Sequence, residues 1–119
     1  MTQVSKDDLR VYLRETEKEI TILRFTAKWC GPCQKLSPIL KEILCKYDEC
    51  DYNLITFDID KEPGIYSFFK RYKMVNGIPA LLFYKKSDYD ENSFYVPCES
   101  ISGLNFNLII NTLDMLLKK

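Results

Sequence analysis

Hydrophobic residues in several segments recur every three or four positions, which is the period of a helix with one buried face. This spacing is clearest from Leu36 to Tyr47 and from Leu104 to Lys118. Ser5 is followed three positions later by Asp8, a capping pattern for a helix that we expect to run from about Lys6 to Glu17. Together with a shorter segment that opens on a proline, these signals predict helices at about 6–17, 63–71 and 104–118, and a further helix that contains 36–47.

Short runs rich in β-branched and aromatic residues predict strands at 20–26, 53–58, 80–84 and 94–96. The polar stretch from Lys86 to Ser93 predicts a turn, so we expect Phe94–Val96 to pair back on strand 80–84 as an edge strand closed by Pro97. This order predicts an α/β fold in which a central mixed β-sheet is flanked by helices on both faces. Because the chain has 119 residues and no linker or internal repeat, we expect a single domain over residues 1–119.

The charge balance argues against polyanionic partners. The 17 basic and 17 acidic residues cancel and form no long block, so we expect neither nucleic acid nor a membrane surface as a partner. The segment Met1–Asp8 is polar and lacks the layout of a secretory signal, and no apolar run approaches the length of a membrane span. The sequence therefore predicts a soluble, cytoplasmic protein, which we expect to be a monomer.

Two of the five cysteines stand in a pattern suited to redox chemistry. Cys30 and Cys33 lie at the start of a predicted helix, where unpaired N–H groups and the helix dipole stabilise the thiolate that attacks a disulfide. We expect Cys30 to be the nucleophile and Cys33 to resolve the mixed disulfide by bonding to it. Gly31 and Pro32 keep the turn tight and start the helix. Trp29 offers a flat apolar contact surface beside the nucleophile.

The motif Trp29-Cys30-Gly31-Pro32-Cys33 resembles the active-site motif of the thioredoxin family, and the resemblance extends from about Ile20 to Lys85. Pro38 falls where members of that family kink their second helix, and Gly77-Ile78-Pro79 is similar to their cis-proline loop. The resemblance implies a thioredoxin fold with a cis Pro79 beside Cys30. It also implies strand-like hydrogen bonds from the Ile78 backbone to a substrate peptide.

Two positions depart from the family pattern. Arg24 stands six residues before the nucleophile, where thioredoxins usually bury an aspartate, and Thr56 replaces the partner lysine. An arginine cannot accept the proton of the resolving thiol. If Arg24 points toward the cysteines, its charge stabilises their thiolates and raises the reduction potential. Pairing with Asp58, or extension to solvent along its aliphatic stem, is the alternative.

The remaining cysteines allow other interpretations. Cys45 and Cys50 could join the first pair as zinc ligands, but Cys33 and Cys45 are separated by about 18 Å along one predicted helix. We therefore expect no metal site, although an iron-sulfur cluster bridged between two chains by Cys30 stays open. Cys45 and Cys50 fit small apolar side chains, with regulatory oxidation or intermolecular pairing as alternatives. We expect Cys98 to be a core or surface thiol, with a position near Pro79 also open.

The resemblance implies a thiol-disulfide oxidoreductase, namely a protein-disulfide reductase active in electron transport and cell redox homeostasis. Its substrates would be protein disulfides, and a thioredoxin reductase or a glutathione system would recycle it. No cofactor is implied beyond the redox-active Cys30–Cys33 disulfide. Two alternatives remain, a disulfide isomerase or oxidase, and a non-catalytic binding module that holds partners in the groove at Pro79.

Overall fold

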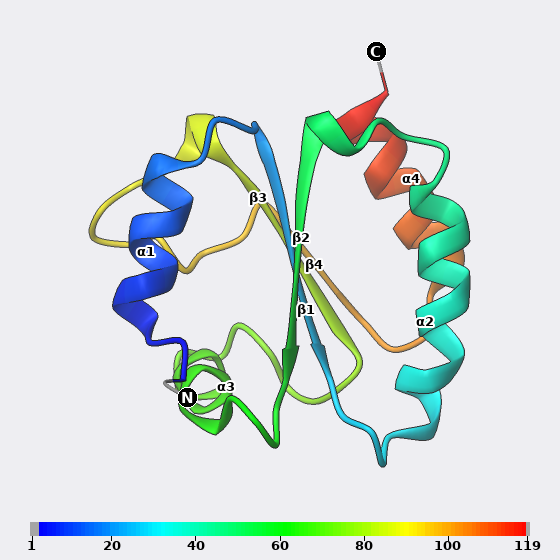
Figure 1. The fold of residues 1–119 in the computed structure, drawn as a ribbon, viewed down its shortest axis with the longest axis horizontal. Coiled ribbons are helices and arrows are strands. Elements are labelled where there is room, and N and C mark those ends of the chain that lie inside the picture. Colours follow the sequence, from blue (N-terminus) through cyan, green and yellow to red (C-terminus); the bar gives the residue numbers. More distant parts are fainter. Residues whose placement is uncertain (1–2, 119) are drawn as a thin grey trace.

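A computed structural model of the chain describes residues 3–118 and contains a mixed sheet with two helices against each face (Figure 1). The elements follow one another as α1 (Lys6–Glu15), β1 (Ile20–Thr26), α2 (Gly31–Leu44), η1 (Glu49–Asp51), β2 (Tyr52–Asp58), α3 (Pro63–Arg71), β3 (Ala80–Lys85), η2 (Lys86–Asp88), β4 (Glu99–Ser102) and α4 (Phe106–Leu117). The expected α/β class, with helices on both faces of a central mixed sheet, is confirmed. Within residues 3–118, every helix is too short or too polar to cross a membrane.

The sheet has the strand order β2-β1-β3-β4. β1 pairs in parallel with β2 and antiparallel with β3, and β4 pairs antiparallel with β3. β1 is therefore an inner strand whose side chains alternate between two buried faces. Ile22 enters the core under α2 and α4, whereas Leu23 and Phe25 enter the core under α1 and α3.

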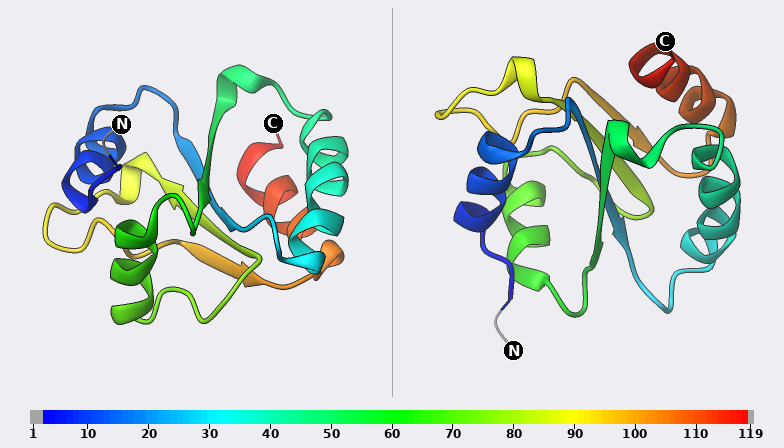
Figure 2. Two further views of the ribbon diagram at one scale, coloured as in Figure 1. Left: turned by 60° about the horizontal axis from the view of Figure 1, so that its bottom comes forward. Right: turned by 45° about the horizontal axis from the view of Figure 1, so that its top comes forward.

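The two cores differ in composition. Under α1 and α3, the fully buried Phe25 ring lies 5.4 Å from the ring centroids of both Phe57 and Phe69. Under α2 and α4, the core is mainly aliphatic, with Leu36 and Ile109 among its fully buried members. In both views of Figure 2, α1 and α3 lie on one side of the sheet, and α2 and α4 lie on the other. Since burial of one such side chain contributes about 2 kcal/mol, these two layers fix which face of β1 each residue occupies.

The helix starts agree with the sequence signals better than the helix ends. The Ser5 hydroxyl accepts the Asp8 N–H and the Asp8 carboxylate accepts the Ser5 N–H, so the capping box is confirmed. α1 ends at Glu15, two residues before the expected Glu17, because Thr16 has an extended backbone. α2 ends at Leu44 and not near Tyr47.

The expected edge strand at Phe94–Val96 is wrong. The strand that pairs with β3 is β4, several residues further along, and 94–96 belongs to the loop before it. The aromatic rings explain the difference, because Phe94 and Tyr95 pack against Phe68 of α3, at centroid distances of 6.0 and 5.5 Å. The loop is thereby drawn over the α1 and α3 side before the chain returns to the sheet.

Tyr84 ties this loop to the sheet, because its buried hydroxyl donates to the Tyr95 carbonyl at 2.8 Å. We predict that Tyr84→Phe lowers the free energy of unfolding by about 1 kcal/mol in a urea titration, the usual loss for one such bond. Tyr89→Phe removes an exposed hydroxyl that donates to Glu91 and serves as the control, with a change below about 0.5 kcal/mol. Equal changes in the two variants would contradict the role of the Tyr84 bond.

Candidate active site

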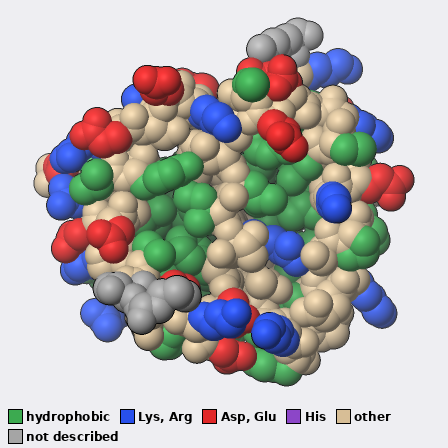
Figure 3. All heavy atoms as spheres, in the orientation of Figure 1, with side chains coloured by type: hydrophobic (Ala, Val, Ile, Leu, Met, Phe, Trp, Pro, Cys, Tyr) green, Lys and Arg blue, Asp and Glu red, His purple; other side chains and the backbone are tan. Residues whose placement is uncertain are grey.

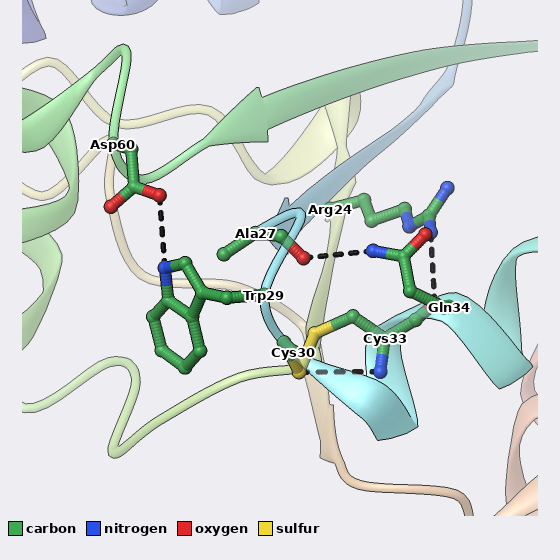
Figure 4. Close-up of a disulfide and its surroundings, with 7 residues drawn as sticks. All are labelled: Arg24, Ala27, Trp29, Cys30, Cys33, Gln34 and Asp60. Carbon is green, nitrogen blue, oxygen red and sulfur yellow. Dashed lines mark hydrogen bonds between the residues drawn. A yellow bond between two sulfur atoms is a disulfide. The ribbon is translucent and has the colours of Figure 1, made fainter.

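The turn from β1 into α2 brings Cys30 and Cys33 together. Cys30 is the N-cap of α2 and Cys33 lies in the first turn, so the helix itself holds their Cα atoms 5.2 Å apart. The two sulfur atoms form a disulfide (Figure 4). This spacing lies within the range that a disulfide requires. The pairing expected from the spacing of the two residues is therefore present.

The helix start supplies a polar environment for the outer sulfur. The Cys33 backbone N–H donates to Cys30 Sγ at 3.2 Å, as an N-cap side chain ordinarily accepts. Cys30 is 6 % exposed and Cys33 is fully buried. Of the two cysteines, only Cys30 therefore keeps any exposed area. Gly31 leaves open space where a side chain would project, and Pro32 stands in the first turn of α2, where its missing N–H costs nothing.

Trp29 presents an exposed indole beside this pair. Its side chain is 68 % exposed, yet its Nε1–H donates to Asp60 Oδ2 at 2.9 Å (Figure 4). Asp60 follows β2, and its own N–H donates to the Asp58 carboxylate at 2.9 Å. The ring is thus tethered from a second loop while its face remains open. The sequence reasoning did not single out Asp60, since only the fold brings the end of β2 next to the end of β1.

A second tether closes the turn itself. Gln34 in α2 donates from Nε2 to the Ala27 carbonyl at 2.8 Å, and the Cys30 N–H donates to the same carbonyl at 3.2 Å. These bonds hold the loop before Cys30 against the first turn of α2. Gln34 was also missed from the sequence, because a polar residue on an amphipathic helix gives no sign of such a contact.

The segment Ile78–Pro79 reaches the same place from another part of the chain. Its peptide bond is cis, as the resemblance implied. Ile78 and Ile59 pack against the small buried cluster of Ala27, Cys30 and Cys33. The Pro79 carbonyl accepts the Gly103 N–H at 3.0 Å, which fixes the loop to the end of β4.

Arg24 lies beneath the first turn of α2. Its Nη2 donates to the Cys33 carbonyl at 3.4 Å, and Figure 4 shows its guanidinium next to Gln34 and not toward the sulfur atoms. Among the described residues it forms no ion pair with Asp58, so that expected alternative is wrong. Burial lowers the pKa of Arg24, but a guanidinium stays charged at neutral pH. A positive charge therefore lies at the base of the turn. Arg24 pairs with Thr56 of β2 in the strand register, and Thr56 is exposed.

The other three cysteines lie away from this site and are exposed free thiols. Cys45 and Cys50, expected as small apolar side chains, are free as expected but lie at the surface, because both follow the end of α2, where the chain leaves the core. The Cys98 N–H donates to the carbonyl of Phe83 in β3. The backbone of Cys98 therefore lies beside Phe83 and not beside Pro79. Desolvation raises the pKa of Cys98 and a hydrogen bond to Asp48 raises that of Cys50, so both thiols carry less thiolate at a given pH.

Across the part of the chain that the structure describes, no three metal-ligating side chains converge on one point. The zinc set weighed for Cys30, Cys33, Cys45 and Cys50 thus has no geometric counterpart there. Both cysteines of the turn are instead bonded to each other.

Comparison with known proteins gives a consistent picture. The family profile described as Thioredoxin matches residues 1–104. The chain is 37% identical over 79 residues to thioredoxin of Buchnera aphidicola, covering 65% of each chain, and 33% identical over 82 residues to thioredoxin of Acidithiobacillus ferridurans, covering 69% of this chain and 70% of that one. It is 34% identical over 74 residues to thioredoxin H8 of Arabidopsis thaliana, covering 62% of this chain.

The matched regions cover only part of the length of these relatives. The matched region spans 45% of the Arabidopsis relative and 65% of the Buchnera relative, which in each case is less than two thirds of that protein.

Solved structures agree over nearly the whole chain. Thioredoxin of Trichomonas vaginalis superposes with a TM-score of 0.72 at 26% identity, covering 96% of this chain and 93% of that one. Oxidised thioredoxin O2 of Arabidopsis thaliana gives a TM-score of 0.71 at 24% identity, covering 99% and 92%, which supports the thioredoxin fold.

The tether on Trp29 generates a prediction that uses the single tryptophan of the chain as its probe. Asp60→Ala removes the acceptor of the indole N–H, so we expect the fluorescence anisotropy of Trp29 to fall because the ring gains rotational freedom. Lys61→Ala changes an exposed neighbour and is the matched control. An unchanged anisotropy in Asp60→Ala would show that the hydrogen bond does not hold the ring.

Proposed function

The chain belongs to the thioredoxin family, and we propose that it is a thiol-disulfide oxidoreductase that reduces protein disulfides with Cys30 and Cys33. One observation carries the proposal: two sulfur atoms lie within bonding distance at the start of α2, with only the first accessible. We also propose that residues 1–119 act as one domain, because both cores are built on the same sheet.

The reaction starts from the reduced dithiol. The Cys30 thiolate attacks one sulfur of the substrate disulfide, and the other substrate sulfur leaves as a thiolate that takes a proton from water. The N–H of Cys33 and the α2 dipole stabilise the Cys30 thiolate before the attack.

Cys33 completes the exchange. It loses its proton and attacks Sγ of Cys30, so that the internal disulfide forms and the second substrate sulfur leaves reduced. Two electrons pass from the dithiol to the substrate, and the oxidised form is the one in Figure 4. Because Arg24 stands at the usual position of a buried carboxylate, water takes the Cys33 proton in this proposal.

The substrate site in this proposal combines Trp29 with the backbone at Ile78 and Pro79. The exposed indole offers an apolar face, and Ile78 contacts the cluster that contains Cys30. An extended substrate peptide would hydrogen-bond to the Ile78 backbone and present its disulfide to Cys30. Protein disulfides are thus the proposed substrates, and a thioredoxin reductase or a glutathione system the proposed recycling partner. We propose that the monomer acts in the cytoplasm, in electron transport and cell redox homeostasis, without nucleic acid or membrane partners.

The activity has a direct test in insulin reduction driven by dithiothreitol. We predict that Cys30→Ser lowers the rate to that of dithiothreitol alone, because the attacking sulfur is gone. Cys33→Ser should also lose turnover but accumulate a mixed disulfide with the substrate, visible as an added mass. Cys98→Ser alters a thiol remote from the turn and should keep the full rate. If Cys30→Ser matched the unchanged chain, the non-catalytic binding module would be the better assignment.

Arg24 supports a second part of the proposal, the direction of the exchange. Its guanidinium does not point toward the sulfur atoms, but it donates to the Cys33 carbonyl at 3.4 Å, so in this proposal its charge acts across the first turn of α2 and stabilises the thiolates more than the uncharged disulfide. This favours the reduced form and gives the pair a more oxidising potential, which moves the protein toward isomerase or oxidase work.

We predict a reduction potential above about −270 mV, the value of thioredoxin, in equilibrium with glutathione. Arg24→Met should lower the potential because the charge is removed while the aliphatic stem is kept. Arg24→Lys, which retains a charge, should stay close to the unchanged chain. A potential near about −270 mV that Arg24→Met does not move would remove Arg24 as a tuning residue.

A further inference from the structure

β2 lies at the edge of the sheet with its outer side unpaired among residues 3–118. The Ile59 N–H donates to the Thr26 carbonyl, which continues the parallel ladder toward β1. In such a ladder alternate residues face opposite sides of the strand. The backbone groups of Leu54 and Thr56 therefore point away from β1, where no other strand meets them.

Lys18 Nζ donates to the Tyr52 carbonyl at 3.2 Å and so covers the start of this edge, but from Leu54 to Thr56 the edge lacks the features by which proteins usually block strand addition. The seven residues Tyr52–Asp58 contain no lysine, arginine or proline, and the strand shows a continuous register with β1. The opposite edge is β4, which has only four residues and begins with Glu99. An extended chain thus finds a long template at β2 and a short one at β4.

A groove runs along β2 on the side of α2. It has a volume of about 380 Å³, and its apolar wall includes Leu54, Leu40 and Leu44. Leu54 is 41 % exposed, although it belongs to a strand. Figure 3 shows hydrophobic side chains in hollows on both sides of the backbone that crosses the centre of the view, where Figure 1 places β2. Alternate side chains of an added strand would enter these two hollows.

The groove also carries positive charge. Arg24 lines it at the end nearest Thr56, and Lys41 lines its α2 wall. Glu49 lies at the other end, beside Tyr52. Because two cations line the groove against one carboxylate, an occupant that brings an acidic side chain to them is favoured.

The strand register says where this acidic side chain would stand. Arg24 pairs with Thr56 on β2, and Ile22 pairs with Leu54. A residue opposite Thr56 on an added strand would have its side chain on the same face as Arg24, about 10 Å from the β1 backbone. A residue two positions away would face Leu54 and the leucines of α2.

We propose that the β2 edge binds an extended segment of a partner protein, which pairs with the β2 backbone and sets an acidic side chain against Arg24 and an apolar one against Leu54. Arg24 belongs to both this surface and the redox turn, but Cys30 and Cys33 take no part in the contact, so the interaction does not depend on the proposed disulfide chemistry. The mode is strand addition, in which main-chain bonds give affinity and alternate side chains give selectivity.

A second copy of the chain fits this edge less well. Antiparallel pairing centred on Ile55 sets Leu54 of the second copy against Thr56 and leaves Arg24 without an acceptor. Within β2, Asp58 is the only residue of a second copy with a carboxylate, and the chain turns away there, since the N–H groups of Lys61 and Glu62 both donate to the Asp58 carbonyl. That register leaves too few pairs for a stable ladder.

The probes for this proposal are two short blocked peptides of alternating threonine and valine, with one leucine and one glutamate two positions apart in either order. Each is titrated against the ¹⁵N-labelled chain. We expect shifts centred on the amides of Leu54 and Thr56 for at least one order. Replacing the glutamate by glutamine in that peptide should weaken binding about tenfold, through loss of the charge-assisted bond to Arg24.

Three variants locate the contact. Arg24→Met should abolish the difference between the glutamate and glutamine peptides. Leu54→Lys should block both peptides, whereas Ser100→Lys, its counterpart on the β4 edge, should bind them like the unchanged chain. Each variant is also run in the insulin assay, so that a loss of redox activity is recorded separately from a loss of binding.

Other results would overturn the proposal. These are no shifts at β2 up to about 1 mM peptide, equal affinity for the glutamate and glutamine peptides, or shifts centred on the redox turn. Self-association in sedimentation that Leu54→Lys abolishes would assign the edge to a second copy instead.

Discussion

The structure depends on one arrangement, a sulfur atom that caps a helix which the central sheet holds in place. Cys30 accepts the Cys33 N–H at the start of α2, and that helix is anchored because Leu36 and Leu40 are buried against β1 and β3. A thiolate at this position gains from the N–H and the dipole only while the helix start stays fixed. The rigidity of the aliphatic core is therefore part of the proposed redox chemistry.

Side chains around the turn hold it by bonding to backbone carbonyls. Gln34 donates to the Ala27 carbonyl and Arg24 donates to the Cys33 carbonyl, so one bond holds the loop before Cys30 and the other holds the backbone of Cys33. Asp60 extends the same principle to Trp29. Each bond fixes backbone or ring without consuming a sulfur lone pair, which leaves Cys30 available for exchange.

Arg24 links the redox turn to the rest of the sheet. Its Nη2 donates to the Cys33 carbonyl of the turn, and the same side chain lines the groove beside β2. A carboxylate bound in that groove would offset the charge that acts on Cys33, because both effects depend on the same guanidinium. The open edge and the redox pair are thus electrostatically connected, although they lie on different surfaces.

The sequence by itself determined the features whose physical cause is local. The Cys30 to Cys33 spacing, the capping box at Ser5 and the periodicity of α2 depend on neighbours within one or two helical turns, and each was found where expected. The strands 20–26 and 53–58 are rich enough in β-branched and aromatic residues to be predicted from the sequence, and their predicted ends agree with those of β1 and β2 within one residue.

Only the tertiary structure decided what depends on contacts between distant segments. The edge strand moved from 94–96 to β4, because Phe94 and Tyr95 gain more from packing on Phe68 than from pairing with β3. Asp60 and Gln34 bond to Trp29 and Ala27 of the site, and Arg24 donates to the Cys33 carbonyl and not to Asp58. These partners come together only when the sheet assembles. Periodicity reports which face of an element is buried, but it carries no record of what lies opposite that face.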